Sequence, residues 1–435
     1  LPEMVPSMTR ATGRLTTRGT EPSAASRPPA KEPVSRSQTN DARDSCDSGC
    51  DGEPWTLFGD CEHLKCHNLV IAGFIDQGFT ANPIGPVDRF NGPNTFNDRA
   101  NEYQLNQVYG YAERATDTGG DGWDLGGRVD LLYGTDYRFT TALGLETNVN
   151  GTRKWNNDSR FYGLAMPQLY AEAAYNDLKV KIGHFYTPAG YEVVPATGNF
   201  FYSHPYTHQY GEPFTHTGVL GTYTATDNLT LMAGFVRGWD NWEDTNDHLS
   251  VIGGGTLANA DAGRSIAYVT VIGDEAPLGA TNEQIRFYQG VVISQELNDD
   301  WQIVLGSDFG NQANAFADGS SAEWYSLYQY LFYKINDCWK AGFRFEWFRD
   351  DDGFRVAGLG TIDPTLGWTG GPGFAGNFYS ATWGLNYQWT PNCRLRPELR
   401  YDWYSGTLGA NNELPYDNGT RAEQFTFAVD LISTF

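Results

Sequence analysis

Residues 394–403 read Arg-Leu-Arg-Pro-Glu-Leu-Arg-Tyr-Asp-Trp, and this stretch decides the fold class. Charged and apolar residues alternate without interruption. Because successive side chains of a β-strand point to opposite faces, the stretch predicts a strand with one apolar, aromatic face and one charged face. The charged face holds Arg394, Arg396, Glu398, Arg400 and Asp402.

The same alternation recurs elsewhere in the chain. In 339–347, five apolar residues from Trp339 to Trp347 alternate with Lys340, Gly342, Arg344 and Glu346, and in 123–133 the polar face holds Asp124, Arg128 and Asp130. No apolar run approaches the roughly 18 residues of a membrane helix. Aromatic residues nevertheless make up 14% of the chain, and 50 residues are Gly. This combination is typical of a membrane β-barrel whose strands are apolar on one face only.

Alternating segments of this kind number about sixteen, which predicts an all-β fold, a closed antiparallel transmembrane β-barrel. The pair 248–256 and 264–272 has the weakest pattern, and without it the count is fourteen. The predicted strands are 68–80, 103–113, 123–133, 168–176, 178–186, 215–225, 228–238, 248–256, 264–272, 284–296, 300–309, 323–335, 339–349, 376–389, 394–404 and 424–435.

The connections between these segments alternate in length. Tight turns such as Asn176-Asp177 and Asn336-Asp337 are followed by long polar loops such as 134–167 and 187–214. Outer-membrane barrels have short periplasmic turns and long external loops, so both termini are expected on the periplasmic side. A soluble β-sandwich or propeller is the alternative, but it need not show this strict rhythm or a face of stacked charges.

The last segment has the apolar face Phe425, Phe427, Val429 and Leu431, and it ends at Phe435. A terminal aromatic residue that closes an alternating strand resembles the C-terminal signal of outer-membrane barrels. We therefore expect Phe435 at the periplasmic rim, as the signal read by the barrel assembly machinery.

The region before the barrel divides into two parts. Residues 1–45 are rich in Pro, Ser and Thr and contain no aromatic residue, which predicts a disordered tail. Residues 46–67 contain Cys46, Cys50, Cys61 and Cys66, and residues 68–435 form the predicted barrel. Two disulfides among the four cysteines are favoured over a metal knuckle with His63 and His67, because the spacing is not that of a zinc finger.

Two further cysteines, Cys338 and Cys393, each follow a tight turn at the same rim. Their strands are separated by one other strand, so their Cα atoms lie roughly 9–10 Å apart, beyond the usual limit of about 7 Å. We predict a disulfide between them if the turns lean together.

The remaining chemistry of the sequence argues against several classes of protein. The formal net charge of −23 excludes a nucleic-acid partner. No phosphate loop, nucleophile elbow or metalloprotease motif occurs, so we expect neither an enzyme nor a cofactor. His184, His204, His208 and His216 occur near two glutamates, but their spacing matches no compact zinc motif and favours polar residues of a pore. Asp350–Gly353 lacks the EF-hand pattern and is expected to be an external loop tip.

Four stretches together resemble the OmpL-like β-barrel porins of planctomycete bacteria. They are Leu169–Tyr186, Asn199–His204, Tyr210–Gly218 and Phe345–Gly353. The resemblance extends over about residues 55–435. It implies an outer-membrane pore without enzymatic activity and leaves the solute open.

The loop 187–214 is the candidate constriction of this pore. It is long and aromatic and contains Glu192 and Glu212 but no Lys or Arg. If it folds into the lumen, it faces the wall about half the strands away, where the inward residues include Lys340, Arg344, Arg394, Arg396 and Arg400. The two sides then create a transverse electric field. In the alternative, the loop stays outside and the arginines pair with Glu346, Glu398 and Asp402.

The sequence thus predicts a porin in the bacterial outer membrane that lets small hydrophilic solutes or ions diffuse passively. The bilayer and the solutes are its expected partners, and an oligomer is compatible with the fold. A substrate-specific channel is one alternative. The other is a structural or adhesive barrel plugged by the Cys-rich segment.

Overall fold

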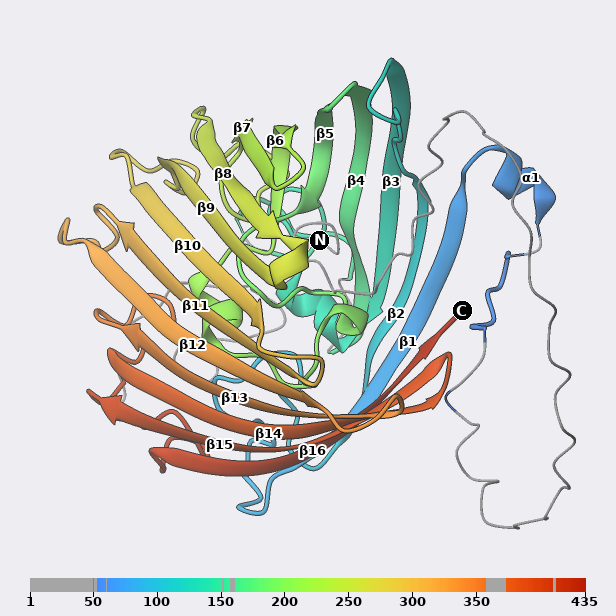
Figure 1. The fold of residues 1–435 in the computed structure, drawn as a ribbon. Helices are drawn as coiled ribbons and strands as arrows, with labels where there is room; N and C mark the ends of the chain where they lie inside the picture. The colour runs from blue at the N-terminus through green and yellow to red at the C-terminus, as the bar shows by residue number, and fades with distance from the viewer. Residues whose placement is uncertain are drawn as a thin grey trace, which may run out of the picture.

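A computed structural model of the protein describes residue 50 and residues 53–59, 61–150, 152–156, 161–356, 373–409 and 412–435. These residues form a closed barrel of sixteen antiparallel strands, in which consecutive strands pair and β16 closes onto β1 (Figure 1). The strands are β1 (Val70–Ala81), β2 (Tyr103–Arg114), β3 (Trp123–Gly134), β4 (Gly163–Tyr175), β5 (Leu178–Tyr186), β6 (Thr215–Thr226), β7 (Leu229–Val236), β8 (Ser250–Asn259), β9 (Arg264–Asp274), β10 (Ile285–Glu296), β11 (Trp301–Gln312), β12 (Ala322–Lys334), β13 (Trp339–Asp350), β14 (Gly376–Thr390), β15 (Cys393–Gly406) and β16 (Glu423–Thr434).

The prediction of a closed, sixteen-stranded antiparallel barrel is confirmed, and the count of fourteen is wrong. The weakest predicted pair is present as β8 and β9. Their turn is closed by Gly263 in the left-handed region (φ 57°), and the side chain of Asn259 accepts a hydrogen bond from the Ala262 N–H. Gly is suited to this turn because it adopts positive φ without a steric penalty. The predicted tail 1–45 and Cys46 lie outside the described residues.

Strand β4 begins five residues earlier than its alternation predicts, at Gly163 rather than residue 168. The pairing with β3 is interrupted there, since Asp130 lies opposite Gln168 whereas Leu132 lies opposite Ala165. This bulge includes Pro167, which has no N–H to donate to the neighbouring strand. The bulge shifts the alternation by one residue, and for this reason the pattern hides the first part of the strand.

The barrel is apolar outside and polar inside. Outward side chains such as Leu125, Ile182 and Leu327 are more than half exposed, whereas the inward Arg344 and Glu346 are fully buried. In a soluble protein this order would be reversed. It is the order that a lipid solvent requires around a closed barrel.

Aromatic residues gather at both ends of the outer surface. At the short-turn end, Trp339 of β13 stacks on Tyr387 of β14 with ring centroids 4.3 Å apart, and Trp301 contacts Tyr333 at 4.6 Å. At the long-loop end, Tyr379 stacks on Trp403 at 5.0 Å. Two such girdles are typical of barrels that span a membrane, because the rings lie at the depth of the lipid headgroups.

The connections keep the predicted rhythm. Two of the short turns are capped by asparagine, because Asn298 Oδ1 and Asn336 Oδ1 each accept hydrogen bonds from two backbone N–H groups that follow. The short connections are 115–122, 176–177, 227–228, 260–263, 297–300, 335–338 and 391–392. The long ones are 82–102, 135–162, 187–214, 237–249, 275–284, 313–321, 351–375 and 407–422.

Helices contribute little to the described chain. They are α1 (Glu62–Cys66), which precedes β1, and the short turns η1 (Thr135–Phe139), η2 (Ala196–Gly198), η3 (Thr207–Gly211) and η4 (Ala260–Ala262). None of the helices among the described residues is long and apolar enough to cross a membrane.

Several long loops fold back into the lumen and form a packed layer there (Figure 1). One apolar cluster joins Tyr206, Tyr210 and Tyr416 of the loops to inward residues of β5–β10 and β12–β15. A second cluster joins Phe96, Tyr137 and Phe214 to inward residues of β1, β2, β3 and β16. The loop layer therefore contacts the barrel wall on opposite sides of the lumen.

Candidate pore constriction

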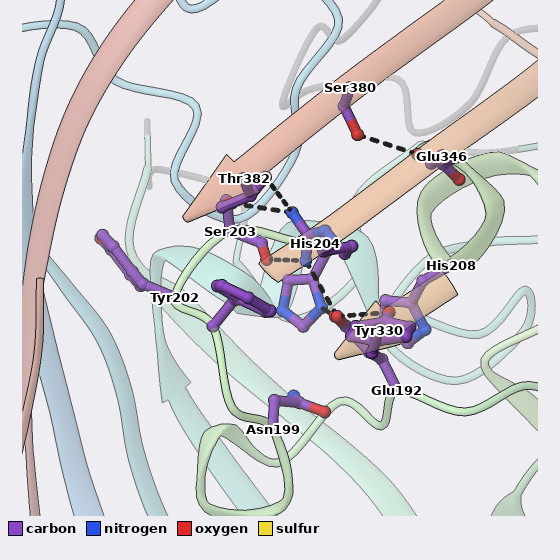
Figure 2. Close-up of polar contacts among 12 residues, drawn as sticks. Glu192, Asn199, Tyr202, Ser203, His204, His208, Tyr330, Glu346, Ser380 and Thr382 are labelled. Atoms are coloured by element: carbon purple, nitrogen blue, oxygen red, sulfur yellow. Dashed lines mark hydrogen bonds and ion pairs between the residues drawn. The ribbon is translucent and has the colours of Figure 1, made fainter. Parts of the chain in front are cut away.

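The loop 187–214 lies inside the barrel against β12–β15, and its central contact is an ion pair. Arg344 of β13 donates from Nη1 to Glu192 Oε1 over 2.9 Å. The hydroxyl of Tyr330 in β12 donates to the same oxygen over 2.7 Å, and Figure 2 shows Tyr330 beside Glu192. The loop is thus joined to two neighbouring strands by one carboxylate.

The second oxygen of Glu192 accepts a hydrogen bond from His204 Nδ1 over 2.6 Å. The ring of His204 stacks on that of His208, with centroids 4.6 Å apart. Burial alone would raise the pKa of Glu192, but the charge of Arg344 and the bond from His204 outweigh it and lower the pKa to about 2. Burial lowers the pKa of both His204 and His208 to about 4. At neutral pH the site is therefore a carboxylate and a guanidinium beside two neutral imidazoles.

Charged residues of the wall also bind the backbone of the loop. Glu346 accepts from the N–H groups of Tyr206 and Thr207, both over 2.6 Å. Glu398 of β15 accepts in the same way from Tyr202 and Ser203, over 2.9 and 3.2 Å. Carboxylates that accept backbone N–H groups fix a loop without requiring a particular loop side chain.

The arginines of β15 bind the carbonyl groups of the same loop. Arg396 donates from Nη1 to the carbonyl oxygens of Ala196, Asn199 and Phe201 over 2.9–3.1 Å, and Arg400 Nη1 donates to that of His204 over 2.5 Å. The loop has no cation of its own, so its carbonyl groups meet the positive wall without repulsion.

The sequence predicts a transverse field between the acidic loop and the basic wall, and in the structure three wall arginines form direct ion pairs with carboxylates. Arg344, Arg396 and Arg400 are at most 2% exposed, because the loop touches them directly. Arg344 pairs with Glu192, Arg396 with Asp430 and Arg400 with Asp402. The physical reason is the cost of a buried, unpaired guanidinium, which draws a carboxylate to each of the three. The predicted alternative pairs the arginines with Glu346, Glu398 and Asp402, and among the described residues Arg400 with Asp402 is the one such ion pair.

Glu212 does not face the basic wall. It lies beside His208, with 3.9 Å between Nδ1 and Oε2. Burial raises the pKa of Glu212 to about 8. The pKa values of the two glutamates of the loop are thus shifted in opposite directions, and the two do not act as one acidic side.

Arg128 and Asp130 belong to a separate inward cluster on β3. Arg128 donates to Asp130 over 2.6 Å and to Glu113 of β2 over 2.9 Å. Asp130 also accepts from Gln168 of β4 over 2.8 Å. Lys340 and Arg394 remain near the short-turn end of the lumen. Neither has a carboxylate partner among the described residues.

The four histidines are not brought together. His184 bonds Thr217 on the neighbouring strand, with 2.8 Å between Nδ1 and Oγ1, and His216 bonds Thr187. Within the described ranges, no three His, Cys, Asp or Glu side chains are arranged to hold a metal ion. Asp350, the first residue of the predicted loop tip, lies inside the barrel and accepts from the backbone N–H groups of Phe354, Arg355 and Val356. It is fully buried, so for Asp350 the prediction of a solvated tip is wrong.

The predicted disulfide between Cys338 and Cys393 is wrong. Cys338 is bonded to Cys50, with their Cα atoms 5.6 Å apart, and Cys393 is free. Cys338 lies in the turn just before β13 and Cys393 is the first residue of β15, so β14 lies between them. The segment that precedes α1 supplies the partner of Cys338 instead. Cys61 and Cys66 are free as well, so neither forms the disulfide predicted within residues 46–67.

The loop 82–102 also enters the lumen, which the sequence does not predict. The residues from Asn91 to Ala100 are buried in the lumen, and Thr95 donates from its backbone N–H and its hydroxyl to Gln209 of the constriction loop. The Asn- and Gly-rich composition is that of an exposed turn, so no signal in the sequence separates this loop from an external one.

The comparisons with known proteins agree with this geometry. Residues 68–435 match the family model "Putative beta-barrel porin-2, OmpL-like". No curated protein sequence matches the chain.

Solved structures are similar at low identity. An anion-selective porin from Comamonas acidovorans is 10% identical with a TM-score of 0.55, and covers 84% of this chain and 99% of its own. OprB of Pseudomonas putida is 12% identical with a TM-score of 0.54, over 87% of this chain and 96% of its own. The channel DcaP of Acinetobacter baumannii is 12% identical with a TM-score of 0.53, over 84% and 97%. At this low identity the similarity to these structures concerns the fold alone. The family match over the whole barrel shows that this chain belongs to the OmpL-like family of β-barrel porins.

Proposed function

We propose that the chain forms a pore in the bacterial outer membrane, through which small hydrophilic solutes or ions diffuse passively. The observation that carries the proposal is a closed barrel with an apolar outer surface and charged residues inside. A barrel of sixteen strands encloses a lumen wide enough for an aqueous channel. Membership of a porin family supports the same conclusion.

The size limit of this pore is set by the loop 187–214, fixed by Glu192 and the inward residues of β12–β15. In the proposed arrangement Arg344, Arg396 and Arg400 shape the constriction by holding the loop. Glu212 belongs to the opposite side of the loop, and the cluster of Arg128 and Asp130 lines the lumen elsewhere.

The orientation follows from the connections. Short turns and both termini lie on the periplasmic side, and the long loops lie outside, as in other outer-membrane barrels. The barrel assembly machinery inserts the chain, with Phe435 as part of its signal, and oligomers form through the apolar outer surface.

A plugged barrel without transport is the second candidate, and the packed loop layer favours it. The Cys-rich segment is a poor plug, because its described residues 53–59 are exposed, and Trp55 bonds Asn392 in a short turn at the rim. In this candidate the plug is the loop layer itself.

Recording from planar bilayers distinguishes the two. The full chain, folded in detergent and added to one side, is expected to give stepwise, ohmic current increases. A saturating solute that blocks the current would identify a substrate-specific channel. Insertion without any current, demonstrated by protease protection of the barrel, would contradict diffusion and leave the plugged barrel.

A further inference from the structure

Two cations of the basic wall do not form an ion pair in the constriction. Arg344, Arg396 and Arg400 each have a carboxylate within 3 Å. Lys340 and Arg394 form no ion pair with a carboxylate among the described residues, although Asp430 and Asp76 lie close enough to Arg394 to attract it. In this they differ from the three arginines that hold the constriction loop.

The two cations face the same part of the lumen. Lys340 of β13 points to the same side as Gly342, whose position is covered by the ring of Phe200 from the constriction loop. Arg394 of β15 donates from Nη2 to the carbonyl oxygen of Thr197, next to that ring in the loop, over 2.9 Å. Lys340 and Arg394 are close enough to repel each other.

A polar side chain lies between them. Asn386 of β14 is directly opposite Lys340 in the strand pairing and is 7% exposed. Its Oδ1 atom is buried without a hydrogen-bond partner, and so is Nε of Arg394. An amide can be turned by 180°, and Asn386 then presents N–H groups instead of the oxygen.

A cation that has no ion-pair partner and keeps a buried, unpartnered N–H donor is suited to bind an anion. A guanidinium and an ammonium group are the donors that form the strongest hydrogen bonds with oxyanions, and low-dielectric walls concentrate their field. We propose that Lys340, Asn386 and Arg394 form a binding site for a small oxyanion, either phosphate or a carboxylate, at the short-turn mouth of the lumen. Thr197 and Phe200 form its floor.

The site has a consequence for transport that rests on the proposed function. A site that holds anions weakly raises their local concentration at the mouth and favours their passage over that of cations. The binding itself does not depend on an open pore, because Lys340 is exposed toward the mouth.

Binding is tested on the full chain folded in detergent, with inorganic phosphate as the probe and its ³¹P line width as the readout. The wild type is expected to broaden the line in a saturable way. The double variant Lys340→Met with Arg394→Met should bind roughly tenfold more weakly for each charge-assisted hydrogen bond lost. Lys334→Met is the matched control, because Lys334 lies opposite Lys340 but is paired with Asp337 over 2.6 Å. It should bind phosphate like the wild type. No saturable broadening by the wild type, or equal broadening by the double variant, would overturn the site.

Selectivity is tested separately by the reversal potential in a potassium chloride gradient. The double variant is expected to shift it toward cations, and Lys334→Met is not. An unchanged reversal potential would overturn the role in selectivity. A wild type that binds phosphate but carries no current would overturn the proposed diffusion and leave the anion site intact.

Discussion

Single buried residues decide where the constriction loop lies. Glu192 of the loop pairs with Arg344 of the wall. On the wall, Glu346 and Glu398 accept hydrogen bonds from the loop backbone, and Arg396 and Arg400 donate to its carbonyl groups. All six are at most 5% exposed. Burial makes these contacts strong, and it also makes the loss of one partner costly.

Glu192→Gln tests the central ion pair. It leaves the guanidinium of Arg344 buried without a counter-ion, which costs about 3–5 kcal/mol for a pair of this kind. We expect faster amide hydrogen exchange in residues 187–214 and a lower denaturation midpoint in detergent. Glu243→Gln is the control. Its pair with Lys154 spans 3.8 Å with both side chains about half exposed, so about 0–1 kcal/mol is expected. Equal effects of the two variants would contradict the ion pair as the anchor.

The pH dependence of the docked loop follows from its titratable groups. Burial lowers the pKa of His204 and His208 to about 4, below the ordinary value of 6.5, so their contribution is present above pH 6.5 and is lost as the pH falls toward 4. Burial raises the pKa of Glu212 to about 8, so its contribution is present below pH 4.5 and is lost as the pH rises toward 8. The two histidines by themselves should therefore weaken docking as the pH falls from 6.5 toward 4, and replacing them isolates their share.

Hydrogen exchange of residues 187–214, corrected for the intrinsic pH dependence of exchange, measures this effect. The double variant His204→Asn with His208→Asn should be weakened less by low pH than the wild type, because the buried carboxyl groups beside the loop titrate in both proteins and only the histidine share is removed. The same pH dependence in the variant and the wild type would exclude the histidines as its cause.

Among the elements, the loop between β5 and β6 differs from the exposed loops. It has no Lys or Arg and is rich in aromatic residues, and it lies inside the barrel beside β12–β15. The wall binds both the backbone of this loop and the side chain of Glu192. An element of this kind narrows the lumen without forming part of the barrel.

Deletion of residues 192–210 is expected to raise single-channel conductance, since the barrel wall needs no residue of this segment for its strand pairing. Bilayer recording measures the change. Deletion of residues 317–320, in an exposed loop between β11 and β12, is the control and should leave the conductance unchanged. Equal conductance of the wild type and the 192–210 deletion would show that this loop does not limit the pore.

The disulfide between Cys50 and Cys338 joins the start of the described chain to the turn between β12 and β13. Peptide mapping without reduction should recover this pair, and alkylation of the unfolded, unreduced protein should label Cys61, Cys66 and Cys393. Cys338→Ser is expected to lower the free energy of unfolding by about 2–4 kcal/mol, as for a typical disulfide, and with it the denaturation midpoint. Labelling of Cys338 in the wild type would contradict the pairing.

The molecule as a whole is a barrel with two different ends. Long loops gather at one end and short turns at the other, where the Cys50–Cys338 disulfide also lies (Figure 1). The proposed orientation in the membrane is inferred from this asymmetry. The orientation can be tested without any assumption about transport.

An epitope inserted after Asp318, in a long loop, should bind antibody on intact cells. The same epitope after Asp227, in a short turn between β6 and β7, should bind only after the outer membrane is permeabilised. The reverse result would show that the barrel is inserted in the opposite direction.

The amino-acid sequence by itself determines the barrel. For most strands, the predicted first and last residues lie within about three residues of the observed ones. The reason is that lipid outside and charge inside impose a period of two on every strand of the barrel. The clear exception is the start of β4, where the bulge at Pro167 interrupts the period. The sequence also indicates the loop 187–214 and the inward arginines.

Only the tertiary structure decides which charge meets which. Glu192 and Arg344 are 152 residues apart, and Cys50 and Cys338 are 288 apart. Neither pairing leaves a periodic trace in the sequence. The physical reason is that solvent selects the face of every strand residue independently, whereas the partner of a buried charge depends on how far the loops enter the lumen and on the cost of leaving that charge unpaired.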